Sequence, residues 1–171
     1  MCLAMLLYWL VMVLHCPVRH ANCPQTAEFF RRAGTNSNAV SICTELAPGL
    51  PTTTADRVQL QQVLMNLMLN GIEAMQDTRG ELTVASKRIE DGQLLISVSD
   101  TGIGLSTDQS ERVFEAFFTT KPRGTGMGLS ISRRIVASHG GQLWATPNTG
   151  RGTTFQFTLP VENVASSPVA T

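Results

Sequence analysis

Hydrophobic residues recur with two different spacings along this chain of 171 residues. Between Asp56 and Met75 they recur at the spacing of one face of a helix. Asp56 suits a helix N-cap, and Gln59 completes a capping-box pattern with it. We therefore predict a long helix after Asp56 that turns one apolar face to a core, formed by Leu60, Val63, Leu64, Leu67 and Met75.

Elsewhere apolar and polar residues alternate, which predicts strands. Asp91-Gly92 is a strong hairpin-turn signal between two such segments. The predicted strands cover residues 40–46, 82–85, 94–98, 142–146 and 153–159, and two shorter helices cover residues 108–115 and 128–139. Because hairpins dominate over strand–helix–strand units, we predict an α+β fold, a two-layer α/β sandwich with a mixed sheet and its helices on one face.

The two ends of the chain follow neither pattern. Residues 3–14 form an apolar run that is too short for a membrane span of about 20 residues, and no basic segment precedes it as in a signal peptide. A weak membrane anchor, an interfacial segment and translated sequence outside the functional fold all remain open. We expect an atypical segment and linker over 1–37, one domain over 38–162 and a disordered tail over 163–171.

The amino-acid composition excludes some classes of function. Lysine and arginine together number 13, as do aspartate and glutamate, so the net charge is zero, which argues against a nucleic-acid surface. The 4 cysteines form no C-x-x-C pair, and no histidine cluster completes a zinc spacing. Free thiols fit a reducing compartment, so we expect a cytoplasmic location, or the cytoplasmic side of the inner membrane if residues 3–14 anchor the chain.

The long helix carries a polar row within its apolar pattern. Asn66 and Asn70 lie four positions apart, and Glu73 three positions further shares their face. Facing inward, such a row needs polar partners, which a divalent cation with a triphosphate would supply. A solvent-exposed polar face explains the same pattern equally well.

Asp100 ends a predicted strand with the parity of its apolar residues, so its carboxylate should point to the core side. A carboxylate there needs a donor, and the exocyclic amino group of adenine is suitable. Gly102 and Gly104 would let the backbone approach a flat base. An ordinary turn of the Asp-x-Gly type at a strand end is the alternative.

The loop at residues 119–126 is rich in threonine, glycine and basic residues, and it follows the aromatic cluster Phe114, Phe117 and Phe118. We expect these three rings to anchor the base of the loop in the core, and the loop to cover a phosphate group as a lid. Gly128 opens the next helix, whose free N–H groups suit phosphate, and Lys121 adds positive charge. In isolation the loop is more typical of a plain surface loop.

Two other phosphate sites are excluded. The chain has no G-x-x-x-x-G-K-[ST] motif, and its glycine cluster follows a loop, where a dinucleotide fold requires a strand. The segments 66–70, 100–104 and 124–128, in this order, resemble the catalytic ATP-binding domain of two-component sensor histidine kinases, a branch of the gyrase-type and chaperone ATPases with the Bergerat fold. The resemblance covers about residues 40–160, with Gly71 where alanine is usual and Met127 where leucine is usual.

This resemblance implies a protein histidine kinase that uses ATP and Mg²⁺, with Asn70 as the magnesium ligand, Asp100 selecting adenine, and Asn66 and Lys121 acting in catalysis. In hydrolysing relatives a glutamate stands at position 66 and activates water, and an amide cannot accept that proton, so transfer to a protein side chain is favoured. The nucleotide-binding residues expected are Asn66, Asn70, Glu73, Asp100, Gly102, Gly104, Thr119, Lys121, Gly124, Thr125, Gly126, Gly128, Leu129 and Thr153.

A phosphoacceptor histidine is not evident. His15 and His20 lie outside any credible amphipathic helix, and His139 ends the predicted helix 128–139, where we expect a structural role. The resemblance therefore implies transfer to a histidine domain in trans, with a response regulator downstream. A non-catalytic ATP-binding regulatory module, an anti-sigma-type serine kinase of the same fold and a truncated, inactive product remain alternatives.

Overall fold

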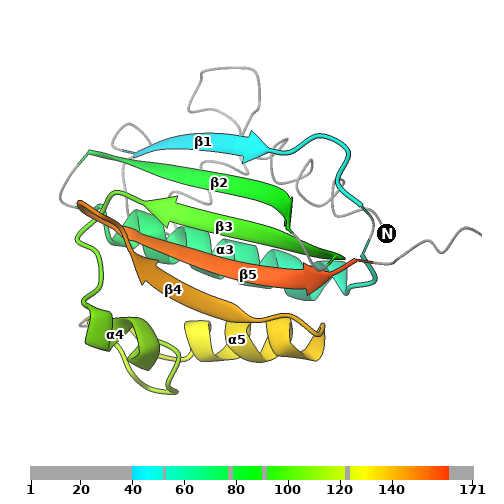
Figure 1. Ribbon diagram of the computed structural model, residues 1–171. Coiled ribbons are helices and arrows are strands. Elements are labelled where there is room, and N and C mark those ends of the chain that lie inside the picture. The colour runs from blue at the N-terminus through cyan, green and yellow to red at the C-terminus, as the bar shows by residue number, and fades with distance from the viewer. Residues whose placement is uncertain (1–39, 52, 77–78, 90–91, 122–123, 162–171) are drawn as a thin grey trace, which may run out of the picture.

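A computed structural model describes residues 40–51, 53–76, 79–89, 92–121 and 124–161 (Figure 1). The predictions for the two ends of the chain, including the apolar run at 3–14, and for Asp91 of the hairpin turn lie outside these ranges. Within the described ranges, no helix combines the length and the apolar character needed to cross a membrane.

Five strands form one mixed sheet, as predicted (Figure 1). They are β1 (Val40–Leu46), β2 (Gly80–Ile89), β3 (Gln93–Asp100), β4 (Leu143–Pro147) and β5 (Thr153–Pro160). Their order across the sheet is β1-β2-β3-β5-β4. The pair β1–β2 is parallel and the other pairs are antiparallel, so the last hairpin inserts β5 beside β3 and leaves β4 at the edge.

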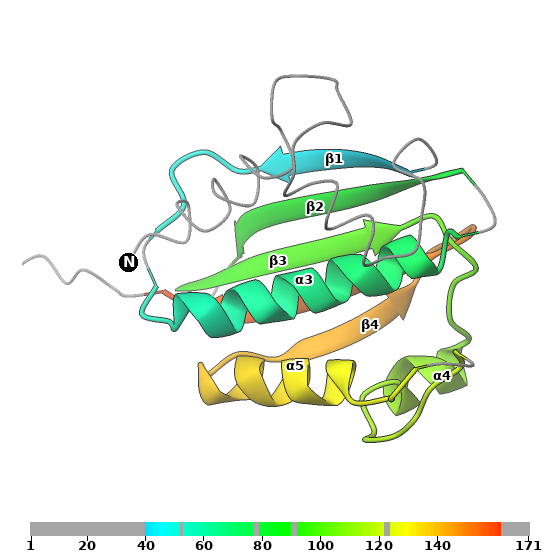
Figure 2. The ribbon, with the colours of Figure 1, turned by 180° about the vertical axis from the view of Figure 1, so that it is seen from behind.

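In the part of the chain that the structure describes, three helices accompany the sheet: α3 (Arg57–Glu73), α4 (Thr107–Arg112) and α5 (Gly128–Ser138). Figure 2 shows α3 crossing one face of the sheet, with α5 beside it next to β4. Helix α4 ends at Arg112, earlier than the sequence predicted, because the chain turns into the lid loop there. The predicted α+β sandwich with helices on one face is confirmed.

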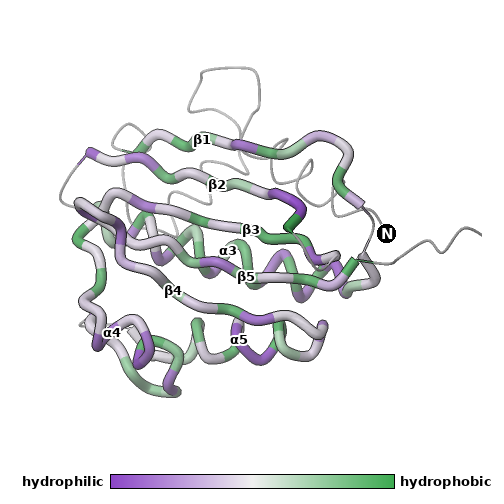
Figure 3. Tube along the Cα trace, in the orientation of Figure 1, coloured by the Kyte–Doolittle hydropathy of each residue, from purple (hydrophilic) through white to green (hydrophobic). Residues whose placement is uncertain are grey.

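The core lies between α3 and the inner face of the sheet. The predicted apolar face of α3 is buried, and Met75 is buried just beyond the end of the helix. Figure 3 shows hydrophobic and hydrophilic positions alternating around α3 and α5, as expected for helices with one covered face. The sheet contributes Leu82, Val84, Leu94, Ile96, Val98, Phe155, Phe157 and Leu159 to this core.

One hydrogen-bond chain ties the start of α3 to the end of α5. The Asp56 side chain accepts from the N–H groups of Val58 and Gln59 at 2.8 and 3.1 Å, which confirms the predicted N-cap. The Asp56 N–H in turn donates to Nε2 of His139 at 3.0 Å, and Nδ1 of that ring donates to the Ile135 carbonyl at 2.7 Å. His139 therefore joins the two helices, which is the kind of structural role expected for it.

Candidate functional site

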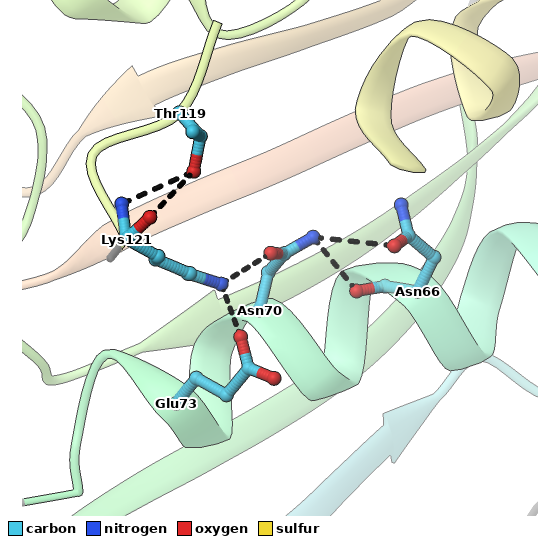
Figure 4. Close-up of polar contacts among 5 residues, drawn as sticks. All are labelled: Asn66, Asn70, Glu73, Thr119 and Lys121. Carbon is cyan, nitrogen blue, oxygen red and sulfur yellow. Dashed lines mark hydrogen bonds and ion pairs between the residues drawn. The ribbon is translucent and has the colours of Figure 1, made fainter. Parts of the chain in front are cut away.

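The polar row of α3 lies toward the lid loop (Figure 4). Asn66, Asn70 and Glu73 are all partly buried on one face of the helix. The Asn70 side chain donates to the Asn66 carbonyl at 2.9 Å, and the Asn66 amide donates to Oγ of Ser132 in α5 at 3.0 Å. The row is thus held between two helices, and the side-chain oxygen of Asn70 is directed toward Lys121 (Figure 4).

The side chain of Lys121 extends from the lid loop to this polar row of α3 (Figure 4). Its ammonium group donates to Oδ1 of Asn70 at 2.6 Å and forms an ion pair with the Glu73 carboxylate. The backbone N–H of Lys121 donates to the Thr119 hydroxyl at 3.1 Å. This bond restrains the lid backbone at the residue that carries the ammonium group. The structure therefore brings together the predicted magnesium ligand, a carboxylate and the predicted phosphate-binding cation.

This arrangement fits a divalent cation. An amide oxygen of Asn70 and a carboxylate oxygen of Glu73 already converge on one positive charge, and magnesium prefers oxygen ligands. Within the described parts of the chain, no three His, Cys, Asp or Glu side chains cluster as a metal site. A magnesium ion here would therefore depend on the Asn70 oxygen together with oxygens of a phosphorylated ligand and water.

Asp100 is buried at the end of β3, with only 3% of its surface exposed. Its Oδ1 accepts hydrogen bonds from the N–H groups of Gly102 at 2.9 Å and Thr153 at 3.3 Å. Burial raises the pKa of the Asp100 carboxyl above its ordinary value, while these two N–H groups and the charge of Lys121 act in the opposite direction. Because both hydrogen bonds end on Oδ1, Oδ2 remains to accept a donor from a ligand.

The space around this carboxylate is kept by glycine at position 71 of α3. A Cβ atom there would lie 3.2 Å from Cβ of Asp100 and 2.6 Å from Cδ1 of Leu82. The glycine costs about 1 kcal/mol of helix propensity relative to alanine. The departure from the family pattern noted at Gly71 thus coincides with the close packing of α3 on Asp100.

The two glycines after Asp100 pack against protein backbone. A Cβ on Gly102 would lie 2.5 Å from the carbonyl oxygen of Ala74, just after α3. Gly104 has a positive φ of 76° and lies against the backbone of Gly152 in the last hairpin. These backbone contacts require glycine at both positions, whether or not a nucleotide base also approaches them.

The lid base differs in one respect from the prediction. Phe114 is buried and Phe118 is partly buried against the core, but Phe117 is 75% exposed, so its predicted anchoring role is wrong. The reason is its left-handed backbone, with φ of 68°, which turns the ring outward while its N–H donates to the Gly126 carbonyl at 3.0 Å. The N–H of Gly124 donates to the Lys121 carbonyl at 3.1 Å and closes the lid further.

Gly128 begins α5, as predicted, and lies directly against the polar row. A Cβ atom on Gly128 would stand 2.4 Å from Oδ1 of Asn66. Thr125 is exposed on the lid and Leu129 packs against the core, and the described contacts place neither in a polar interaction with the other predicted site residues. Thr153 is buried and meets Asp100 through its backbone N–H.

Sequence reasoning missed two residues of the site. Ser132, which is 1% exposed, holds Asn66 from α5, and its signal was a hydroxyl one helical turn after Gly128 on an otherwise apolar face. Asn148 donates to the Asp100 carbonyl at 2.9 Å from the turn between β4 and β5. In the sequence it has no signal beyond that of a turn residue.

Comparisons with known proteins identify the family of this chain. A sequence profile of the family described as histidine kinase-, DNA gyrase B- and HSP90-like ATPase matches residues 55–163. Sensor protein FixL of Bradyrhizobium diazoefficiens is 48% identical over 129 residues, which are 75% of this chain and 26% of FixL. Sensor protein TdiS of Thauera aromatica is 43% identical over 71% of this chain and 23% of its own. The chain thus spans about a quarter of the length of these curated relatives.

Solved structures give the same result. The catalytic domain of histidine kinase ThkA is 30% identical with a TM-score of 0.72, and the match covers 94% of this chain and 93% of that domain. Full-length ShkA in complex with AMPPNP is 32% identical with a TM-score of 0.68, over 80% and 28% of the two chains. ThkA in complex with the response regulator TrrA is 27% identical with a TM-score of 0.69, over 95% and 41%. The predicted histidine-kinase-type ATP-binding domain is confirmed, and the chain belongs to the family of histidine kinase-, DNA gyrase B- and HSP90-like ATPases.

Proposed function

We propose that this chain is the ATP-binding catalytic part of a sensor histidine kinase, which binds Mg-ATP and donates the γ-phosphoryl group to a histidine supplied in trans. The observation that carries the proposal is the contact of Lys121 with Asn70 and Glu73. It brings a lid cation and two oxygen ligands together at one point, although they come from segments about 50 positions apart. Such convergence is what a metal-bound triphosphate requires.

Adenine recognition is assigned to Asp100. Oδ2 accepts the exocyclic amino group of adenine, while Oδ1 is already held by the N–H groups of Gly102 and Thr153. A guanine carbonyl at the same position would place an acceptor against an acceptor. The site should therefore bind ATP in preference to GTP.

Phosphate binding is assigned to the lid and the start of α5. The N–H groups at Gly128 and the helix dipole favour an anion, and Gly128 lies against Asn66 in the polar row of α3. In the proposed bound state, Lys121 leaves Asn70 and turns its ammonium group to the phosphates. Magnesium, when bound, would neutralise phosphate charge at the Asn70 oxygen.

Asn66 favours phosphoryl transfer to a protein side chain over hydrolysis of ATP by water. Its side chain is an amide that donates to Ser132, so it cannot serve as the general base that activates water. The remaining contribution of the chain is positioning and charge neutralisation. The sensor kinases among its relatives support histidine as the acceptor, and the complex of ThkA with TrrA supports a response regulator as the downstream partner.

Binding is tested by calorimetric titration with a non-hydrolysable ATP analogue, with and without magnesium, and with the matching GTP analogue. We expect magnesium-assisted binding that prefers adenine. Asn70→Ala should weaken binding of the magnesium complex by about tenfold or more, because it removes the proposed metal ligand. Gln62→Ala, an exposed position on the same helix, is the matched control. Equal magnesium-dependent affinity in Asn70→Ala and the wild type would refute the assignment on α3.

Transfer is tested by incubating the chain with labelled ATP and an isolated phosphoacceptor domain of a related sensor kinase. We expect label on that domain that is lost in acid and kept in base, as phosphohistidine requires. Acid-stable label would point to the serine kinase instead. Tight ATP binding without transfer to any such domain would favour the regulatory module.

A further inference from the structure

Asn148 lies in the turn that joins β4 to β5. Its partners Ser99 and Thr154 alternate with the buried residues Asp100 and Phe155, so they point to the face of the sheet away from α3. Three hydrogen bonds leave its side chain. Its amide nitrogen donates to the Asp100 carbonyl at 2.9 Å and to the Ser99 hydroxyl at 3.3 Å, and its amide oxygen accepts from the Thr154 hydroxyl at 2.7 Å. The hydroxyls of Ser99 and Thr154 also share a hydrogen bond of 2.8 Å. One side chain thus links the end of β3 to the start of β5.

The place of these contacts in the sheet explains why a side chain is needed there. Ser99 and Thr154 form the last pair of β3 with β5, so Asp100 lies beyond the end of that ladder. Its carbonyl takes a hydrogen bond from Asn148, where a longer strand would have used a backbone N–H. The Asn148 N–H donates to the Gly152 carbonyl at 3.1 Å, which closes the turn and fixes the amide above the end of β3.

The same turn also holds the other side of Asp100. Gly152 passes so close that a Cβ atom would stand 1.8 Å from the Asp100 carbonyl oxygen, and its φ of 95° is open to glycine. The next residue, Thr153, donates its N–H to the carboxylate at 3.3 Å. Two neighbouring parts of the chain therefore hold Asp100. Asn148 in the turn binds its backbone carbonyl, and Thr153, the first residue of β5, binds its carboxylate.

From this geometry we infer that Asn148 is a positioning residue for adenine selectivity. It acts through Asp100 and does not touch the nucleotide, because its side chain lies on the outer face of the sheet and the carboxylate on the inner face. By fixing the carbonyl of Asp100, it holds Oδ2 in the direction in which it accepts the adenine amino group. The inference rests on the proposed function for the role of Asp100, but the restraint on Asp100 is independent of any ligand.

Asn148→Ala removes all three hydrogen bonds, and Asn148→Asp keeps the size of the side chain but replaces its N–H donors by a negatively charged acceptor. The control is Thr149→Ala, an exposed residue of the same turn. The preference for the ATP analogue over the GTP analogue should fall by about tenfold in both Asn148 variants and remain unchanged in the control. The gain in affinity from magnesium should stay as in the wild type, because Asn70 belongs to α3.

Two comparisons separate a positioning role from general destabilisation. In an Asp100→Asn background, Asn148→Ala should leave the ratio of ATP to GTP affinity unchanged, because the group that it positions is gone. In the chain without ligand, amide hydrogen exchange at Gly102 and Thr153 should be faster in Asn148→Ala than in Thr149→Ala.

Different results would overturn the positioning role of Asn148 and the proposed function. Unchanged exchange at Gly102 and Thr153, or an unchanged nucleotide ratio in Asn148→Asp, would overturn the positioning role. A wild-type chain that binds no ATP analogue would overturn the proposed function, and the role in selectivity with it, even where the exchange data show the restraint on Asp100.

Discussion

Replacing Asp100 by asparagine changes one atom of the site. The amide oxygen can still accept from the N–H groups of Gly102 and Thr153, which both bind Oδ1, so the local backbone should keep its geometry. The amide nitrogen takes the place of Oδ2 and presents a donor to the amino group of adenine. A hydrogen bond to a charged group contributes about 1.5–3 kcal/mol, so ATP affinity should fall roughly 10- to 150-fold.

Asp100→Asn should weaken ATP binding but increase the stability of the fold. Burial raises the folded-state pKa of Asp100, so its contribution to stability is fully present when the carboxyl is protonated and is lost as pH rises through the raised pKa. The ionised form is therefore the less favourable one for folding. Asp100→Asn removes this cost and should increase the free energy of unfolding at neutral pH, while weakening ATP binding.

Calorimetry with the ATP and GTP analogues gives the selectivity, and urea unfolding between acidic and neutral pH gives the stability. Adenine preference in the wild type should weaken as pH falls through the raised pKa, because a protonated carboxyl presents a donor. Asp108→Asn, an exposed aspartate in the first turn of α4, is the control for the loss of one charge. An unchanged ratio of ATP to GTP affinity in Asp100→Asn would refute the adenine role, and a clear loss of stability would refute the account of its burial.

Two further predictions concern packing. Gly102→Ala would place a Cβ 2.5 Å from the Ala74 carbonyl, a backbone atom with no freedom to rotate away, so we expect a loss of about 1–3 kcal/mol in urea unfolding together with weaker nucleotide binding. An unfolding midpoint equal to the wild type would contradict this packing. Ser86, buried on β2, has a hydroxyl without a hydrogen-bond partner among the residues that the structure describes, so Ser86→Ala should gain about 1 kcal/mol by the same measurement. A loss of stability there would show that the hydroxyl has a favourable interaction.

Local patterns were sufficient for the elements and for the direction of several side chains. The spacing of Leu60, Val63 and Leu64 predicted the buried face of α3, and the strand β1 has the predicted bounds. The parity of Asp100 along its strand predicted that the carboxylate is buried, because successive side chains of a strand point to opposite faces. These features depend on neighbours a few positions away, so the sequence alone specifies them.

Phe117 shows where local reasoning stops. Its neighbours Phe114 and Phe118 pack inward, as their apolar character predicts, but Phe117 has a left-handed backbone conformation, in which its N–H donates to the Gly126 carbonyl. That bond joins two ends of the lid, so no pattern around Phe117 reveals it. The backbone conformation of the lid therefore outweighs the hydrophobic preference of this aromatic ring.

The amino-acid sequence by itself determined the type and order of the helices and strands, the polar row on α3 and the family, because short-range spacing and motif order carry that information. Only the tertiary structure decided that β5 lies between β3 and β4, that Lys121 meets Asn70, and that Asn148 holds Asp100. Each of these contacts joins residues about 50 positions apart or depends on the order of strands. Such contacts form when the core excludes alternative packings, and an asparagine in a turn has no local signal of the backbone carbonyl that it will bind.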